Sequence, residues 1–243
     1  MVRPPKVIGH RGAAGSAPEN TLAGFRRAAA VGAPWVEFDA RLTADGQAVV
    51  FHDDRLERTT NGRGRLATTP VAELRRLDAG AWFGAAFAGE RVPTVGEALA
   101  LIAALGMGAN MEIKPDPGRD GKVARAAMEA ALAAWPEGRE PPLVSSFSSA
   151  ALVVAREVAP DWPRGLLVDR LPSDWRDITV RLDCATLHCG HRGLDARGVA
   201  AVRDAGLAML AFTVNDSDRA RRLWDWGVAG VFTDFPERLL AAM

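Results

Sequence analysis

The stretch WVEFDARLTADGQAVVFH, residues 35–52, decides the fold. Two short runs rich in β-branched and aromatic residues, 35–41 and 48–52, are separated only by Leu-Thr-Ala-Asp-Gly-Gln. The Asp45-Gly46 pair is typical of a tight hairpin turn, and a parallel crossover needs a dozen or more residues. We therefore expect 48–52 to return antiparallel against 35–41.

Outside this hairpin, short apolar runs alternate with longer Ala-, Leu- and Arg-rich segments of helical period. Strands are expected near residues 6–9, 35–41, 48–52, 109–113, 143–146, 165–168, 185–188, 209–213 and 230–233. Helices are expected over 21–31, 94–105, 122–134, 148–158, 196–205, 217–226 and 237–243, with a weaker pattern over 172–180. This alternation is typical of βα units around a parallel sheet. With the returning arm set aside, eight strands remain, and the sequence predicts an α/β fold, a (β/α)8 TIM barrel.

The length of the chain fits one barrel with a small insertion. The chain has 243 residues, and α/β barrels reach roughly 250 residues as single domains. Residues 53–92 show no strong strand pattern but several Gly and Arg. A loop of this length in a compact domain is usually functional or a small insertion. We expect one domain over 1–243, with 53–92 as a cap at the mouth of the barrel.

The composition excludes several classes of partner and location. Thirty Lys and Arg balance thirty Asp and Glu, whereas a nucleic-acid-binding domain normally shows an excess or a stripe of positive charge. Cys184 and Cys189 lack the paired spacing of a zinc site and form no disulfide framework, so reduced thiols are expected. No stretch approaches the roughly 18 apolar residues of a membrane span, and the N-terminus lacks a signal peptide's apolar segment. The sequence predicts a soluble cytoplasmic protein that has no membrane span and binds no nucleic acid.

Charged side chains stand where the expected strands end. In barrel enzymes the active site lies at the C-terminal ends of the strands. The residues in these positions are His10, Arg11, Glu37, Asp39, His52, Glu112 and Lys114. Because residues two apart on a strand point to the same face, Glu37 lies beside Asp39 and Glu112 beside Lys114. Three carboxylates then converge on one lumen.

Three carboxylates in a confined space repel one another unless positive charge joins them. Ligation by oxygen alone suits a hard cation such as Mg²⁺, Ca²⁺ or Mn²⁺. The alternative is that each carboxylate pairs with one of the many arginines of the chain. With three carboxylates at strand ends and two histidines nearby, the pattern favours a divalent metal.

Histidine is scarce, with four in the chain, and His10 and His52 both follow strands at the same mouth. A lone histidine is more often a packed or surface residue than a catalyst. Two of them beside a metal site and two cations are typical of a general acid and a general base flanking a phosphate. His188 ends the strand expected over 185–188, three residues before His191, and for His188 a place in the pocket and a surface role are about equally expected.

A set of motifs runs in order over essentially the whole chain and resembles the bacterial glycerophosphodiester phosphodiesterases. The motifs are HRG at 10–12, PENT at 18–21, ExD at 37–39, LTADG at 42–46, HDDRLERTTNGRG at 52–64, LDAGAWF at 77–83, GERVPTVGEAL at 89–99, EIK at 112–114, SF at 146–147, TVN at 213–215 and TDFP at 233–236. HRG alone is a weak signal, whereas the ordered set is highly specific.

The resemblance implies a TIM barrel with a small insertion, a divalent metal ion (Mg²⁺ or Ca²⁺), and hydrolysis of glycerophosphodiesters to sn-glycerol 3-phosphate and an alcohol. Carried over position by position, it makes His10 and His52 the acid/base pair, Glu37, Asp39 and Glu112 the metal ligands, Arg11 and Lys114 the phosphate ligands, and Glu19 a substrate contact or a support of the site. It leaves open whether water or the glycerol 2-hydroxyl attacks first, which histidine is acid and which is base, and whether the chain forms a homodimer.

One aromatic residue departs from the family's pattern, and the roles of three others stay open. Phe212 stands where the family often has tryptophan, and we expect an altered pocket shape and headgroup preference with the chemistry unchanged. Trp82, Phe83 and Phe87 either line the glycerol side or pack the insertion onto the barrel. Two rival functions remain, a phospholipase-D-like hydrolase of lysophospholipids and a non-catalytic barrel that binds a phosphorylated ligand. The modest insertion disfavours the first rival, and the complete set of charged residues disfavours the second.

Overall fold

The computed structural model describes residues 2–243, and its strands form a closed parallel barrel. The strands are β1 (Val7–Gly9), β2 (Trp35–Leu42), β3 (Ala48–Val50), β4 (Gly108–Ile113), β5 (Leu143–Ser146), β6 (Arg164–Val168), β7 (Thr186–Gly190), β8 (Ala208–Phe212) and β9 (Gly230–Thr233). Their order is β1-β9-β8-β7-β6-β5-β4-β2, and the pairing of β1 with β2 closes the ring. The predicted (β/α)8 TIM barrel is confirmed.

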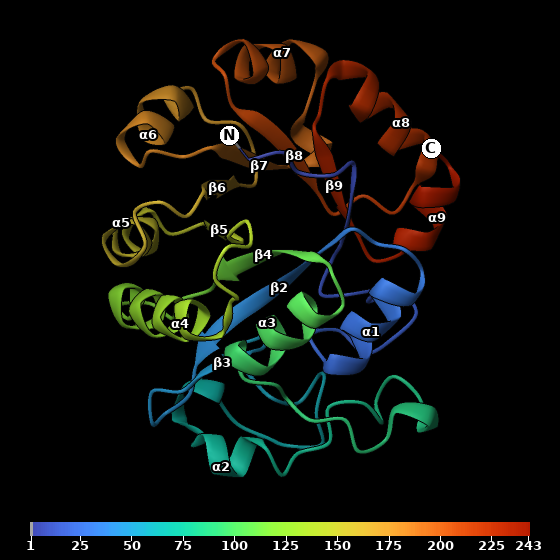
Figure 1. Cartoon of the computed structure of the whole chain (residues 1–243), viewed down its shortest axis with the longest axis vertical. Coiled ribbons are helices and arrows are strands. Elements are labelled where there is room, and N and C mark those ends of the chain that lie inside the picture. Colours follow the sequence, from blue (N-terminus) through green and yellow to red (C-terminus); the bar gives the residue numbers. More distant parts are fainter. Residues whose placement is uncertain (1) are drawn as a thin grey trace.

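Helices surround the strands in a ring (Figure 1). They are α1 (Leu22–Ala30), α2 (Val71–Leu74), α3 (Val95–Ala104), α4 (Asp120–Ala134), α5 (Ser149–Val158), α6 (Trp175–Arg181), α7 (Ala196–Asp204), α8 (Ser217–Trp226) and α9 (Pro236–Ala241). Short 3-10 helices lie at Leu66–Thr68, Ala85–Phe87 and His191–Gly193. The weak pattern over 172–180 corresponds to α6, which begins only at Trp175.

One strand, β3, lies outside the barrel and is the returning arm of a hairpin. β3 pairs antiparallel with β2, with Leu42 opposite Ala48, and Gly46 takes the positive φ of 84° that the turn requires. The strand ends at Val50, two residues before the expected end. Phe51 still donates its backbone N–H to the Asp39 carbonyl at 2.9 Å, so the antiparallel arm places the next residue, His52, alongside the middle of β2.

The lower part of the barrel lumen is filled by apolar side chains. They are Ile8, Leu143, Leu210 and Phe232, one each from β1, β5, β8 and β9, with Trp35 and Phe212 packed against them. Two larger clusters fill the layer between the strands and the outer helices. Because the lumen is closed from below, any ligand enters from the C-terminal ends of the strands.

Residues 53–92 build a small core of their own beside β3, at the lower edge of Figure 1 around α2. Leu56, Leu66 and Leu74 of this segment are buried against Val49 and Phe51 of the arm. Among residues 2–243, no helix has both the length and the apolar character that a membrane span requires. Cys184 and Cys189 are free thiols, as expected.

Candidate active site

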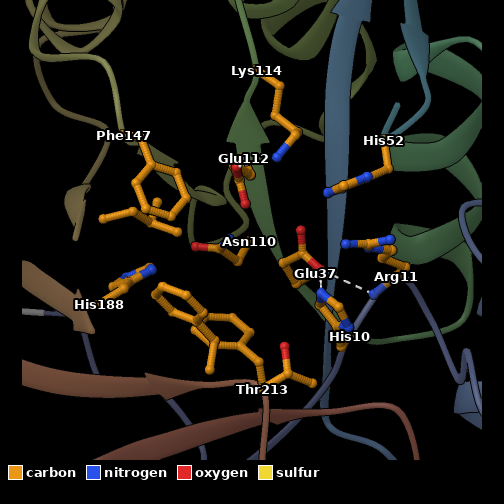
Figure 2. Close-up of a pocket in the computed structure, with 13 residues that line it drawn as sticks. His10, Arg11, Glu37, His52, Asn110, Glu112, Lys114, Phe147, His188 and Thr213 are labelled. Carbon is orange, nitrogen blue, oxygen red and sulfur yellow. Dashed lines mark hydrogen bonds and ion pairs between the residues drawn. The ribbon is translucent and has the colours of Figure 1, made fainter. Parts of the chain in front are cut away.

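A pocket of about 190 Å³ opens at the C-terminal ends of the barrel strands. It is lined by His10, Arg11, Glu37, His52, Asn110, Glu112, Lys114, Phe147, Leu167, His188, Phe212, Thr213 and Phe232. Figure 2 shows charged groups on one side and Phe147 with His188 on the other. Both predicted histidines, both predicted phosphate ligands, Phe212 and two of the three predicted metal ligands therefore line one pocket.

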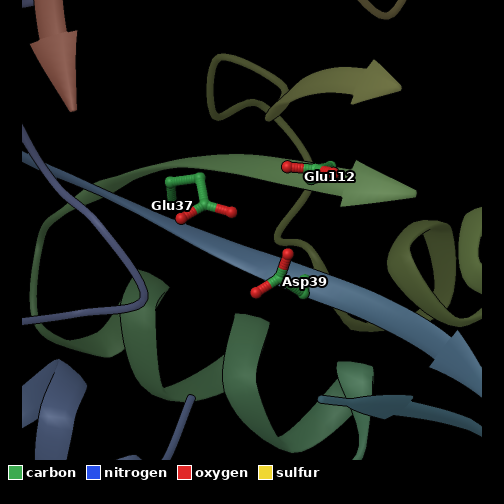
Figure 3. Close-up of side chains that lie close together, drawn as sticks. All are labelled: Glu37, Asp39 and Glu112. Carbon is green, nitrogen blue, oxygen red and sulfur yellow. The ribbon is translucent and has the colours of Figure 1, made fainter. Parts of the chain in front are cut away.

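Strand register brings the three carboxylates together. Asp39 on β2 pairs with Glu112 on β4, and Glu37 lies one inward-facing position below Asp39. One oxygen from each carboxylate lies within 4.8 Å of the others, and Figure 3 shows the three side chains close together on two neighbouring strands. Glu37 and Asp39 are 3% and 1% exposed, so water screens their mutual repulsion poorly.

Two cations offset part of this negative charge. Arg11 Nε lies 3.3 Å from Asp39 Oδ2, and Lys114 Nζ lies 3.0 Å from Glu112 Oε1 and 3.7 Å from Asp39 Oδ1. Glu37 Oε2 accepts a hydrogen bond from the Arg11 backbone N–H at 3.0 Å. Glu37 Oε1 is buried without a hydrogen-bond partner within residues 2–243. The alternative that each carboxylate pairs with an arginine is thus met only in part, because two cations, Arg11 and Lys114, face three carboxylates.

Burial and the remaining negative charge shift the pKa values of the three carboxyl groups. Burial, with the charges of Asp39 and Glu112, raises the pKa of Glu37 well above its ordinary value. Burial and the charge of Asp39 raise the pKa of Glu112 to about 7. Burial also opposes ionisation of Asp39, but Arg11 and Lys114 together outweigh it and lower its pKa. A divalent cation would favour the ionised forms of Glu37 and Glu112 and so lower both raised pKa values. A donor set made only of oxygens, one of them buried without a partner, fits a hard ion.

A tight turn after β1 positions His10. Arg11 adopts a positive φ of 51° and is followed by Gly12 at 91°, which turns the Arg11 backbone N–H toward Glu37. His10 Nδ1 lies 2.7 Å from Asp234 Oδ1, and Asn215 donates a hydrogen bond to the other Asp234 oxygen at 2.6 Å. His10 Nε2 is left on the pocket side, 3.9 Å from Glu37 Oε2.

His52 has a similar arrangement built from the insertion. Its Nδ1 lies 2.6 Å from Asp53 Oδ1, and Arg58 holds both oxygens of Asp53 with two hydrogen bonds of 2.6 and 2.9 Å. Burial lowers the pKa of His52, and Arg11 and Lys114 add to the lowering against the opposing charge of Asp39. The neutral imidazole is therefore favoured near neutral pH.

Of the two remaining predicted substrate-binding residues, Phe212 lines the pocket and Glu19 does not. Glu19 does not line the pocket; it bridges Arg11, at 2.7 Å, and Arg58, at 2.7 and 2.8 Å, and so ties the turn after β1 to the insertion. Phe212 does line the pocket and meets Phe147 edge to face, with ring centroids 5.8 Å apart.

The aromatic cluster of the insertion, Trp82, Phe83 and Phe87, packs on itself in edge-to-face pairs. None of the three is among the residues that line the pocket within the described chain. This geometry fits packing within the insertion better than contact with glycerol.

Four residues of the site went unassigned or undecided in the sequence. Asp53 and Asp234 lie inside quoted motifs, but only the structure pairs them with the histidines. Asn110 faces the lumen two residues before Glu112, a spacing that could have indicated it. His188 is fully buried and lines the pocket, whereas His191 lies in a neighbouring groove.

Comparison with known proteins shows which family the chain resembles. The sequence profile of the Glycerophosphoryl diester phosphodiesterase family matches residues 10–238. A glycerophosphodiester phosphodiesterase of Caldanaerobacter subterraneus is 36% identical, with 96% of each chain covered, and one of Bacillus subtilis is 32% identical, covering 95% of this chain and 84% of the other. A phosphodiesterase structure from Oleispira antarctica, in complex with the product sn-glycerol-3-phosphate, has a TM-score of 0.95 and 43% identity, covering 98% of this chain and 96% of that one.

Proposed function

The chain belongs to the Glycerophosphoryl diester phosphodiesterase family, and from this premise we propose that it hydrolyses glycerophosphodiesters to sn-glycerol 3-phosphate and an alcohol with the help of a divalent metal ion. As a member of this family it is a phosphoric diester hydrolase. The observation that carries the proposal is the C-terminal mouth of the barrel, where three carboxylates, two cations and two carboxylate-bound histidines lie together in and beside one pocket.

The metal, Mg²⁺ or Ca²⁺, would be held by Glu37, Asp39 and Glu112. The raised pKa values of Glu37 and Glu112 support this assignment, since both acids lack sufficient positive charge. When bound, such an ion polarises phosphoryl oxygens and offsets the charge that develops on them. Lys114 already contacts Glu112 at 3.0 Å, so the ion and a substrate phosphate would lie next to each other.

The chain's own residues then handle charge and protons. Arg11 and Lys114 bind the phosphate oxygens and stabilise their growing charge in the transition state. One of His10 and His52 accepts the proton of the nucleophile, water or the glycerol 2-hydroxyl, as the new P–O bond forms. The other donates a proton to the alcohol oxygen as its P–O bond breaks. Asp234 and Asp53 hold the two imidazoles by their Nδ1 atoms, which leaves each Nε2 for these transfers.

The remaining assignments concern the edges of the site. Glu19 supports Arg11 from behind and keeps its guanidinium in place, while Phe212 shapes the wall of the pocket and the headgroup preference. We assign residues 1–243 to one catalytic domain, with 53–92 as the cap that supplies Asp53 and Arg58. A cytoplasmic location and a homodimer stay predictions.

The test measures glycerol 3-phosphate release from glycerophosphocholine, glycerophosphoethanolamine and glycerophosphoglycerol, with Mg²⁺, Ca²⁺ or EDTA. Activity is expected with metal and not with EDTA. His10→Ala and His52→Ala should each lower kcat by roughly 10²- to 10⁴-fold, while His191→Ala, a histidine outside the pocket, serves as the matched control. Full activity in EDTA would refute the metal, and near-normal turnover of either histidine variant would refute the acid/base pair.

A further inference from the structure

One buried arginine at the mouth of the barrel has no part in the chemistry above. Arg41 lies on β2, two residues after Asp39, and is 7% exposed. Because residues two apart on a strand share a face, its side chain leaves β2 on the same face as Glu37 and Asp39. Burial of a charge lowers stability unless partners satisfy it, so the groups that Arg41 contacts show what it holds in place.

The guanidinium of Arg41 joins three segments of the chain. Its Nε donates a hydrogen bond to the His52 carbonyl at 2.7 Å, and its Nη2 lies 2.8 Å from Asp54 Oδ1. On the other side, its Nη1 donates a hydrogen bond at 3.2 Å to Oδ1 of Asp116, in the loop between β4 and α4. Arg41 therefore holds the start of the insertion against β2 and is itself anchored by Asp116.

The contacts to His52 and Asp54 enclose the residue between them, Asp53. Arg41 holds the backbone just before Asp53 and the side chain just after it. Asp53 itself faces the His52 ring, with Oδ1 2.6 Å from Nδ1, and Arg58 donates hydrogen bonds to both of its oxygens. Arg41 thus fixes the ends of this three-residue segment, and Arg58 fixes the carboxylate in its middle.

The hydrogen bonds of the hairpin do not reach His52. Beyond the end of β3, Phe51 donates one further backbone hydrogen bond, to the Asp39 carbonyl. Within residues 2–243, the only group that donates a hydrogen bond to the His52 carbonyl is the Arg41 guanidinium. The hydrogen bonds that locate His52 therefore come from side chains, Arg41 at its carbonyl and Asp53 at its ring.

The geometry of these contacts requires an arginine. A guanidinium is planar and carries five N–H donors in a fixed fork, and each of the three nitrogens of Arg41 faces a different oxygen. Lysine has one nitrogen on a flexible stem, so it would keep the charge but not all three directions. Proton transfer needs heavy atoms within about 2.6–3.2 Å of each other, and a misplacement of about 1 Å can lower a rate by roughly 10²-fold.

We propose that Arg41 is a positioning residue for His52: it holds residues 52–54 against β2 so that the imidazole meets the substrate at the distance of proton transfer. The proposal rests on the proposed function, because it assigns Arg41 to one member of the acid/base pair. Arg41 acts through the backbone of His52 and touches no reacting atom. Its loss should therefore lower the rate of the chemical step only while His52 is present.

The first test measures kcat for glycerophosphocholine with Mg²⁺ or Ca²⁺, per folded molecule as judged by circular dichroism. Arg41→Ala should lower kcat by roughly 10- to 10²-fold, and Arg41→Lys should retain part of the lost rate. Arg164→Ala is the matched control: Arg164 is 3% exposed and also binds several carbonyls and Asp183, but it lies at the start of β6, at the end of the barrel opposite the pocket. An unchanged kcat in Arg41→Ala, or an equal loss in Arg164→Ala, would overturn the proposal.

The second test is a double-mutant cycle, which separates positioning from a structural role. In the His52→Ala background, Arg41→Ala should change kcat by no more than about twofold, the scatter of independent changes. Loss by the same factor with and without His52 would show a merely structural role and overturn the proposal. If Arg41→Ala does not fold, Arg41→Lys carries the same cycle. Near-normal turnover of His52→Ala alone would instead refute the acid/base pair, and with it the part of the proposed function on which this inference rests.

Discussion

Replacing Glu112 by glutamine should stabilise the metal-free protein at alkaline pH. Glu112 is 8% exposed, and burial, with the charge of Asp39, raises its pKa from 4.5 to about 7. A carboxyl whose pKa is raised on folding contributes stability below its unfolded pKa, and this contribution is lost as the pH rises through the folded pKa. Glutamine has nearly the same shape and never ionises.

The magnitude follows from the two pKa values. A difference of about 2.5 pKa units, from 4.5 to about 7, corresponds to about 3 kcal/mol at 1.36 kcal/mol per unit. The stability advantage of Glu112→Gln should thus be about 1 kcal/mol at pH 5 and about 3 kcal/mol at pH 8. With roughly 2–4 °C per kcal/mol for a chain of this size, Tm of the variant should exceed that of the parent by roughly 6–12 °C at pH 8.

Thermal unfolding in EDTA at several pH values between 5 and 8 measures this difference. Other groups titrate in the same range: the lowered pKa values of His52 and His188 make stability rise with pH, so only the difference between parent and variant isolates Glu112. Added Mg²⁺ or Ca²⁺ should reverse the order at pH 8. In the parent the apparent metal affinity should weaken about thirtyfold from pH 8 to 5.5, because a proton competes. A Tm difference that stays constant from pH 5 to 8 would refute the reasoning.

Three further substitutions probe the supports of the site. Asp234→Asn removes the carboxylate that holds His10 Nδ1 and should lower kcat by roughly 10- to 10²-fold with little change in KM; steady-state kinetics with unchanged kcat would contradict the positioning role. Arg58→Met removes the cation that holds Asp53, so the pKa of His52 should rise and one limb of the kcat/KM profile should move to higher pH, the acidic limb if His52 is the base and the basic limb if it is the acid; two unmoved limbs would contradict it. Gly165→Ala would force Thr186 and His188 to shift and should lower the free energy of unfolding by about 1–3 kcal/mol in a urea titration; an unchanged midpoint would show that the space is not tight.

Much of the barrel could be predicted because its signals are local. The turn at Asp45-Gly46 and the short spacing around it identify β3 as antiparallel, and the observed register of Leu42 with Ala48 confirms this. The same locality explains why Glu37 and Asp39 could be placed on one face, since alternation along a strand depends on that strand alone. The helix boundaries were harder to predict. The pattern indicated a helix from Pro172, but α6 begins at Trp175, whose backbone N–H donates a hydrogen bond to the Pro172 carbonyl.

The rest of the site depends on how distant strands meet. Asp234 reaches His10 across 224 positions of sequence, a contact that exists only because β9 pairs with β1 and closes the barrel. The sequence could not decide whether His188 lies in the pocket or on the surface, because its inward direction is set by the register of β7 against β6 and β8. Such contacts follow from barrel closure and not from any spacing within a single motif.

Strand register also explains why a charged and an uncharged side chain lie at different depths on β4. Asp39 and Glu112 form the upper inward-facing pair, and Glu37 and Asn110 form the pair below it. The cost of burying a charge rises with depth, so ionised groups are tolerated where Arg11, Lys114 and a cation reach them. Asn110 and His188 carry no charge at neutral pH, and each makes one side-chain hydrogen bond, to Ser145 and to Thr186.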